Sequence, residues 1–448
     1  MSERAISGDL TKGTEWKVLL LFSFPLLLSN ILQQLYLIVD SIIVGQFIGV
    51  EALAAISACY FVYYFIIAVI IGIGSGITVV VSQYFGARCY AEVQLATTSF
   101  VIFTLFAGIA LSIIGICFAE DIFRMIRTPE EVIPSAIEYF RIYIAGSFIY
   151  LIFNSLISVM RGIGDARRPL YFSLIATLTN VVLCLFFVVV LKWGLQGAAL
   201  STIIAQLIGV IIAIFYINGK HPIISLRWNR LRFDRDIFLK GIRIGLPTSV
   251  QQGAIALGLI ALLGIVNSFG TPTLTAYGAA GKIETFITQP ILALCSALAA
   301  FTGQNIGAKQ YDRIRNGLRC TLLLTLTIST AAIVLIIPFG KEIMRLFTTD
   351  SEVIAIGREY LIIVSSFFIF HGLMNTFNGL LRGSGATLFP MIISIVSLWI
   401  IRIPLAYLFS SWWGVTGIWW SIITAWILGF SATYLYYRMN NWKKKAVV

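Results

Sequence analysis

The chain has 448 residues, of which 59% are hydrophobic and only 12% charged, and its mean hydropathy is +0.92. Soluble domains carry about 25% charged residues, so this composition excludes a soluble globular protein and predicts an integral membrane protein. The net charge of +12 does not indicate a nucleic-acid partner, because the basic residues fall in short loops between apolar runs.

Long apolar runs follow a polar N-terminal stretch that lacks the short apolar core and cleavage site of a secretory signal, so we expect the first run to be retained. The runs exceed the roughly 20 residues that a transmembrane helix needs and lack the alternating polarity of barrel strands. The predicted fold class is all-α integral membrane, with twelve transmembrane helices in two pseudo-twofold-related six-helix bundles. The predicted spans are 17–44, 53–82, 94–118, 134–160, 170–191, 196–217, 241–268, 274–303, 317–339, 354–381, 388–409 and 415–437.

The first predicted span contains a single carboxylate, Asp40, among apolar neighbours such as Val39 and Ile42. An ionised side chain left bare in hydrocarbon costs at least about 2.5 kcal/mol, so it needs a partner, a water-filled cavity or a proton. We therefore interpret Asp40 as a candidate functional residue. The alternative is that Asp40 caps the outer end of a helix.

Lysine and arginine are concentrated on one set of alternate loops, which predicts that this side of the membrane is cytoplasmic. We expect both chain termini there, in a multi-pass protein of the plasma membrane. The basic side holds Arg4, Lys12, Lys17, Arg88, Arg161, Arg167, Arg168, the loop after residue 217 (with Arg227, Arg230 and Arg232), Lys309, Arg313, Arg382, Arg438 and Lys443–Lys445. The other side holds chiefly Arg124, Arg127, Lys192, Lys341 and Arg345.

The loop 218–240 divides the chain near its middle, and we interpret it as a solvated linker or a helix on the anionic inner leaflet. The chain on its two sides is an internal duplication, because five blocks recur in the same order at offsets of 220 to 222 residues. The pairs are FSFPLLLSN with RIGLPTSVQ, SQYFGAR with TGQNIGAK, EDIFRMIRTPEEV with KEIMRLFTTDSEV, VMRGIGDA with LLRGSGAT, and KWGLQGAAL with SWWGVTGIWW.

Each copy contains six predicted spans, an even number, so both copies enter the membrane from the same side. Such copies are related by an axis along the membrane normal, as in parallel-repeat transporters, and we expect them to face each other across a central cleft. The predicted domains are an N-terminal six-helix bundle (1–217), a cytoplasmic linker (218–240), a C-terminal six-helix bundle (241–437) and a basic cytoplasmic tail (438–448).

The five paired blocks resemble those of the multidrug and toxic compound extrusion (MATE) family, and the resemblance covers essentially the whole chain. It implies an antiporter that exports amphipathic, often cationic, small molecules against sodium or proton entry. It also implies that the protein is not an enzyme and has no catalytic residues and no cofactor. The ion that it would use is the coupling ion, Na⁺ or H⁺. The expected partners are small-molecule substrates and the lipid bilayer, and we expect a monomer.

The resemblance implies a cation site in the N-terminal bundle. The positions that match the family's motif are Asp40 and Tyr36 in the first span, Tyr139 in the fourth, Asn180 and Cys184 in the fifth, and Thr202 in the sixth. The chain departs from the family's pattern at Cys184, where an Asp is expected. A thiol is a poor ligand for a hard cation, so the site either holds sodium weakly or works as a proton carrier, and the sequence leaves both open. No other metal site is expected.

The duplication allows a comparison with the second copy, where Leu262 stands at the position of Asp40 and the eleventh span has no acid. A purely structural cap would give no reason for this asymmetry, although drift after the duplication would also explain it. The cation chemistry is thus expected in one bundle only.

Three further polar residues are candidates for contact with substrate in the cavity: Glu284, Gln33 and Gln34. For Glu284 the alternative is an acid that faces cavity water or is neutralised by a basic side chain. Pro25 and Pro247 stand at matching places in the two copies, where a proline favours a kink. They are either hinges coupled to the load on Asp40 or static kinks that shape the cleft.

Two other functions compete with efflux. The first is a flippase for a lipid-linked or other amphipathic lipid, which would need several basic residues for pyrophosphate in its cleft. Only Arg141 and Arg402 are basic residues plausibly within spans, which disfavours it. The second is a membrane-embedded enzyme, which would need a cluster of catalytic polar residues that the spans do not supply.

Overall fold

The structure of the chain is a computed structural model that describes residues 8–126, 128–227, 229 and 231–447. Of the basic residues used above to predict orientation, Arg4, Arg127 and Arg230 lie outside the described residues. The described part of the chain is helical throughout its regular elements and contains no strand.

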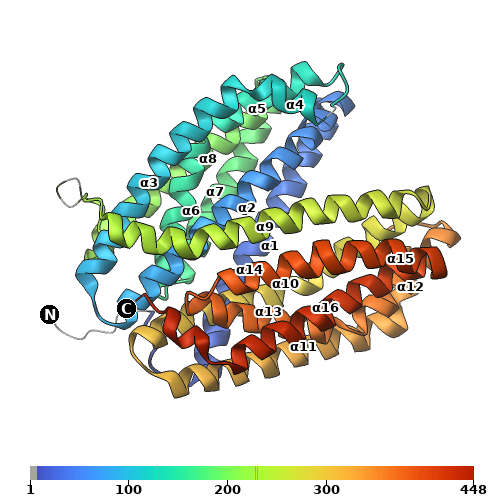
Figure 1. Cartoon of the computed structure of the whole chain (residues 1–448). Coiled ribbons are helices and arrows are strands. Elements are labelled where there is room, and N and C mark those ends of the chain that lie inside the picture. Colours follow the sequence, from blue (N-terminus) through green and yellow to red (C-terminus); the bar gives the residue numbers. More distant parts are fainter. Residues whose placement is uncertain (1–7, 127, 228, 230, 448) are drawn as a thin grey trace. The chain divides into compact units, whose positions relative to one another are not determined.

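Figure 1 shows the arrangement of the helices along the chain. Within the described residues, ten helical stretches are each long and apolar enough to cross a membrane, and two bent pairs of helices pass the same test as pairs, which makes up to twelve spans. The upper end of this count agrees with the twelve predicted spans. The helices of the first copy are α1 (Glu15–Phe47), α2 (Val50–Gly86), α3 (Tyr90–Cys117), α4 (Ala119–Met125), α5 (Ile133–Ala145), α6 (Ser147–Gly162), α7 (Arg167–Leu185), the π-helix η1 (Phe186–Val190) and α8 (Gly194–Lys220).

The short 3₁₀-helix η2 (Pro222–Ile224) lies in the linker. The elements of the second copy follow in the same order. They are α9 (Arg235–Asn267), α10 (Thr271–Gly307), α11 (Tyr311–Arg345), α12 (Ser351–Ser365), α13 (Phe368–Gly383), α14 (Leu388–Ile395), the π-helix η4 (Val396–Arg402), α15 (Ile403–Trp413), α16 (Val415–Arg438) and the 3₁₀-helix η5 (Asn441–Lys445).

The chain forms two compact units. Unit 1 consists mainly of Leu28–Gly245, and unit 2 consists of Leu10–Leu27 together with the chain from Leu246 onward. Helices α1 and α9 therefore each contribute to both units, with the division after Leu27 in α1 and after Gly245 in α9. The predicted domains 1–217 and 241–437 follow the duplication in the sequence, whereas these units follow the packing.

The repeated sequence blocks fall where the backbone must take an unusual conformation. Arg88 and Lys309, which end the blocks SQYFGAR and TGQNIGAK, both have a positive φ, of 59° and 57°. The amide of the following residue then bonds back to a carbonyl five residues earlier, Cys89 N to Tyr84 O at 2.9 Å and Gln310 N to Asn305 O at 2.8 Å. This pattern ends a helix and satisfies its last carbonyls, so the block is repeated because both copies need the same helix stop.

The RG-x-G blocks are repeated for a related reason. Gly164 and Gly385 have φ values of 83° and 86°, a region in which other residues are strained. Gly162 and Gly383 stand where helices approach closely, since a Cβ on Gly383 would lie 2.3 Å from the carbonyl oxygen of Ala299. Both features fix how α6 and α13 end against their neighbours in their own unit.

The fourth and tenth predicted spans, 134–160 and 354–381, are not continuous helices. Helices α5 and α6 meet at 48°, and α12 and α13 meet at 51°. At each break the hydrogen bonds shorten to a three-residue spacing, as from Gly146 N to Tyr143 O (3.1 Å) and from Phe367 N to Val364 O (3.2 Å). Such a change of hydrogen-bond register bends a helix, and local hydropathy does not report it.

Each unit has its own apolar core. In unit 1, Phe123, Phe140 and Val44 are almost fully buried together with Cys184 and Tyr139. In unit 2, Trp419, Met344 and Leu262 occupy the core with Tyr360. The candidate polar residues thus lie within or beside the best-packed part of each unit.

Candidate functional site

Asp40 lies inside α1, and the helix continues for about two turns beyond it to Phe47. Its carboxylate is therefore not at a helix end. The residue is 7% exposed, and Ile43 and Val44 on the next turn are buried in the core of unit 1. The helix forms here because the run from Leu26 is apolar except for a few polar residues on one side, and its packing in unit 1 buries the side that carries Asp40.

The thiol of Cys184 donates a hydrogen bond to Oδ1 of Asp40, with the sulfur 3.5 Å from the oxygen. Cys184 is completely buried on α7, directly before the π-helix η1. Among the described residues, no lysine, arginine or histidine forms an ion pair with Asp40. The position at which the sequence departs from its family is therefore the direct neighbour of the acid, and it supplies no charge.

Thr202 on α8 links the other polar residues that sequence analysis grouped with Asp40. Its hydroxyl lies 2.9 Å from Tyr36 Oη and accepts a hydrogen bond of 3.1 Å from Nδ2 of Asn180. The same amide nitrogen lies 3.4 Å from Oγ of Ser201. Tyr36 is one turn before Asp40 on α1, and Asn180 is one turn before Cys184 on α7. Each polar residue of α1 is thus linked to one of α7: Asp40 to Cys184 directly, and Tyr36 to Asn180 through Thr202.

Tyr139 on α5 is 3% exposed and lies close enough to Asp40 and Tyr36 to interact with both electrostatically. Its ring lies 6.4 Å from that of Tyr63 and 6.2 Å from that of Tyr143. Tyr143 in turn contacts Tyr63 at 4.1 Å between ring centroids. These aromatic rings form a wall beside the polar residues.

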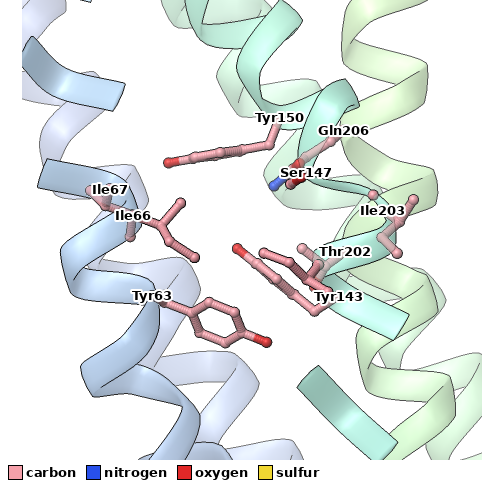
Figure 2. A pocket seen from close by; sticks show the side chains of 11 residues that line it. Tyr63, Ile66, Ile67, Tyr143, Ser147, Tyr150, Thr202, Ile203 and Gln206 are labelled. Atoms are coloured by element: carbon pink, nitrogen blue, oxygen red, sulfur yellow. The ribbon is translucent and has the colours of Figure 1, made fainter. Parts of the chain in front are cut away.

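A pocket adjoins this wall, with about 370 Å³ of empty space including its opening. Figure 2 shows Tyr143 and Tyr150 reaching from the bent α5–α6 pair toward α2, which contributes Tyr63, Ile66 and Ile67. Thr202 is part of the lining, so the pocket and the polar group around Asp40 share a residue. Gln33, an exposed residue of α1, lies close to Tyr150, and Gln34 next to it in the sequence is also exposed.

The donor set is suited to a hard monovalent cation or a proton. Asp40 offers a carboxylate, Tyr36 and Thr202 offer hydroxyl oxygens, and Asn180 offers an amide. Hard cations prefer such oxygen ligands, while a neutral thiol adds little. The described part of the chain contains no group of three or more His, Cys, Asp or Glu side chains that could hold a transition metal.

Unit 2 holds Glu284 on α10, whose carboxylate accepts a hydrogen bond from the hydroxyl of Tyr360 on α12. Leu262, the counterpart of Asp40, is completely buried in the core of this unit. Arg402, at the end of η4, lies close to Tyr277 and interacts electrostatically with it and with Glu284. The structure thus supplies a basic side chain near Glu284, which was one of the two interpretations of that residue.

Pro25 and Pro247 both lie inside long helices, in α1 and α9. In each helix the proline is within two residues of the division between the two units. Prolines at these places interrupt the backbone hydrogen bonds where a helix leaves one unit and enters the other.

Several residues of the site had escaped sequence analysis, chiefly Tyr63, Tyr143, Tyr150 and Gln206 of the pocket. A signal was present, because Tyr139, Tyr143 and Tyr150 follow one another at spacings of four and seven, which places them on one helical face. The bend at Gly146 prevents that face from being read as a single stripe.

The chain is similar to known proteins over its whole length. The family model MatE matches residues 25–186 and again residues 247–408, one match in each copy of the duplication. The chain is 30% identical over 455 residues to the probable multidrug resistance protein YoeA of Bacillus subtilis, with 99% of this chain and 98% of the relative covered. It is 24% identical over 432 residues to the FAD transporter of Shewanella oneidensis, with 94% of each protein covered.

The fold is likewise similar to solved structures. A multidrug resistance MATE family transporter in an outward-facing conformation matches with a TM-score of 0.90 at 24% sequence identity, covering 99% of this chain and 100% of the other. At this level of identity the match concerns the fold, and together with the number of candidate spans it confirms the predicted fold class of twelve transmembrane helices in two six-helix bundles.

Proposed function

The chain belongs to the MatE family of multidrug and toxic compound extrusion transporters, and on this premise we propose that it is a secondary active antiporter. It exports amphipathic small molecules that carry a cationic group, in exchange for sodium or protons, by alternating access. It works as a monomer in the plasma membrane with both termini in the cytoplasm, and it needs no cofactor. The names of the relatives, a probable multidrug resistance protein and an FAD transporter, indicate that substrates differ among similar proteins.

The observation that carries the proposal is the burial of Asp40 without a positively charged partner among the described residues. An acid in that position is stabilised when a cation or a proton neutralises it. Cys184 donates a hydrogen bond to it, and Tyr36, one turn away on α1, is linked through Thr202 to Asn180. All four of these groups are polar but neutral. Loading and unloading of Asp40 therefore changes the net charge inside unit 1 by one, which is the property that a coupling site requires.

Proteoliposomes that contain the full chain test this proposal. Uptake of ethidium is driven by a sodium gradient in one preparation and by a proton gradient in another, for the wild type and for Asp40→Asn. We expect Asp40→Asn to lose gradient-driven transport, because the amide cannot carry a charge. Unchanged transport by the variant under both gradients would remove Asp40 from the mechanism.

The matched control is Asp165→Asn. Asp165 is also buried, but its Oδ1 accepts hydrogen bonds from the backbone amides of Arg167 and Arg168 at the start of α7. It serves as a local cap outside the group around Asp40. We expect the control to keep both gradient-driven transport and its stability, because the side-chain oxygen of Asn accepts hydrogen bonds from backbone amides about as well as that of Asp.

A further inference from the structure

Unit 2 holds two opposite charges that the coupling mechanism does not use. Glu284 lies on α10 and Arg402 at the end of η4, and both are partly exposed. The carboxylate of Glu284 accepts a hydrogen bond from Tyr360, and the guanidinium of Arg402 lies close to Tyr277. Among the described residues no ion pair joins Glu284 to Arg402. Each charge thus lies beside a tyrosine, and the two charges are near each other without forming an ion pair.

The two tyrosines belong to a rigid aromatic frame. The rings of Tyr277 and Tyr360 meet edge to face at 5.7 Å, and Trp419 stacks on Tyr277 with an interplanar angle of 2°. Trp419 also meets Tyr360 edge to face at 4.7 Å and is completely buried. Because this frame is part of the core of unit 2, the two phenol groups are fixed in place. The carboxylate of Glu284, which accepts a hydrogen bond from Tyr360, is therefore kept at a fixed position.

Arg402 retains unused capacity to donate hydrogen bonds. Its Nε is buried and has no hydrogen-bond partner in the described structure. A guanidinium carries five N–H donors in a planar fork that matches a carboxylate or a phosphate, and it keeps its charge in any protein environment. An arginine in a membrane span without a carboxylate on its fork is costly, which is typical of a group kept for a ligand.

The first copy of the duplication has neither charge. Tyr63 stands at the position that matches Glu284, and Tyr139 at the position that matches Tyr360. In unit 1 these two rings pack edge to face at 6.4 Å, and in unit 2 the same pair of positions forms the hydrogen bond between Tyr360 and Glu284. The second copy, which has Leu262 in place of Asp40, therefore has its own pair of charges. Glu284 stands where the first copy has Tyr63, and Arg402 stands where the first copy has a valine.

We propose that Glu284 and Arg402 bind a zwitterionic substrate, with Arg402 receiving its carboxylate and Glu284 receiving its cationic group. The proposal rests on the transport function proposed above and narrows its substrate class from amphipathic cations to amphipathic molecules that carry both charges. An aromatic body suits such a substrate, because Tyr277 and the His371–Trp426 ring pair (4.7 Å between centroids) lie on the same helices as the two charges or next to them.

Two dyes that differ by one charge test the proposal. Rhodamine B carries a benzoate on a cationic ring system, and its ethyl ester has the same rings without the negative charge. Binding of each dye to the purified full-length protein in detergent is measured by fluorescence anisotropy for the wild type, Arg402→Gln, Glu284→Gln, the double variant and Arg141→Gln. Arg141 is an exposed arginine of α5, so its variant controls for the loss of one positive charge.

We expect Arg402→Gln to weaken binding of rhodamine B about tenfold or more, as for the loss of a charge-assisted hydrogen bond, while binding of the ester changes little. Arg141→Gln should leave both dyes unchanged. The proposal is overturned if Arg402→Gln leaves rhodamine B binding unchanged, or if both dyes lose affinity equally.

The double variant, Arg402→Gln with Glu284→Gln, tests whether Arg402 binds the carboxylate of the dye or only neutralises Glu284. It removes both charges together, so no unpaired charge is left that would impair folding. If Arg402 only neutralises Glu284, the double variant binds rhodamine B as the wild type does, and the proposal fails. If Arg402 receives the carboxylate, the double variant still prefers the ester. Because binding is measured without an ion gradient, this outcome is independent of Asp40→Asn, which tests the antiport itself.

Discussion

The sulfur of Cys184 lies 3.5 Å from Oδ1 of Asp40, so this buried acid has a neutral thiol as its direct hydrogen-bond donor. A thiol donates a weak hydrogen bond and offers a soft sulfur, so it lowers the charge density that a sodium ion would meet. We therefore expect Asp40 and Cys184 together to determine whether sodium or a proton is the coupling ion.

Replacing Cys184 by Asp tests this choice. Two adjacent carboxylates hold a sodium ion better than one does, and each makes the other harder to ionise when no cation is present. We expect Cys184→Asp to lower the sodium concentration for half-maximal ethidium transport about tenfold, the equivalent of ~1.4 kcal/mol. Sodium titration in proteoliposomes at constant pH measures it, with Cys184→Ser as the neutral control. An unchanged sodium dependence would mean that position 184 does not face the ion.

Thr202 connects Tyr36 and Asn180, and its replacement by Val removes the shared oxygen while keeping the shape of the side chain. Both partners then lose a buried hydrogen bond, which costs roughly 1–3 kcal/mol of stability. We expect Thr202→Val to reduce transport about tenfold and to lower the melting temperature in detergent. Thr104→Val is the control, because the hydroxyl of Thr104 bonds only backbone carbonyls of its own helix. An equal loss of transport in both variants would contradict a specific role for Thr202.

Sequence reasoning reached the twelve spans and the duplication because length, hydropathy and repeated helix-ending blocks are local properties. It grouped Asp40, Asn180, Cys184 and Thr202 through family resemblance, and the structure brings these residues together, although their role as a cation site stays a prediction. The bends at 48° and 51° and the position of Arg402 close to Tyr277 were not predicted. They depend on hydrogen-bond register and on contacts between distant helices, which no single apolar run encodes.

Gly108 on α3 allows close approach of α6. A Cβ at this position would lie 2.3 Å from Cα of Phe148, a backbone atom that cannot move aside alone. Small residues permit such contacts between membrane helices, and overpacking costs about 1–3 kcal/mol. We expect Gly108→Ala to lower the melting temperature in detergent by several degrees. Gly219→Ala, where a Cβ would meet nothing within 4 Å, should not lower it. Equal stability of the two variants would show that α3 and α6 tolerate separation.

His221 follows α8, outside the membrane-spanning segments, and its Nε2 lies 3.9 Å from Oδ2 of Asp165. Burial lowers the pKa of His221 from its ordinary value of 6.5, against an opposing effect of Asp165 and with a further lowering by Arg168. The unfolded chain therefore takes up this proton more readily than the folded one, so stability falls as the pH drops below 6.5. We expect His221→Gln to lose less stability than the wild type between pH 7 and pH 5, measured by thermal unfolding, because it lacks this group. A larger loss in the variant would reverse the sign and contradict the burial effect.

Pro25 and Pro247 stand within two residues of the places where α1 and α9 pass from one unit to the other, so we expect both to be hinges. A proline leaves one carbonyl without its helical partner and lowers the resistance of the helix to bending. Pro25→Ala and Pro247→Ala should each slow ethidium export in proteoliposomes several-fold while leaving the melting temperature unchanged or slightly raised. Pro338→Ala is the control, since Pro338 lies inside α11, which belongs entirely to unit 2. If the two variants transport as fast as the control, the prolines are static kinks that shape the helices and take no part in the cycle.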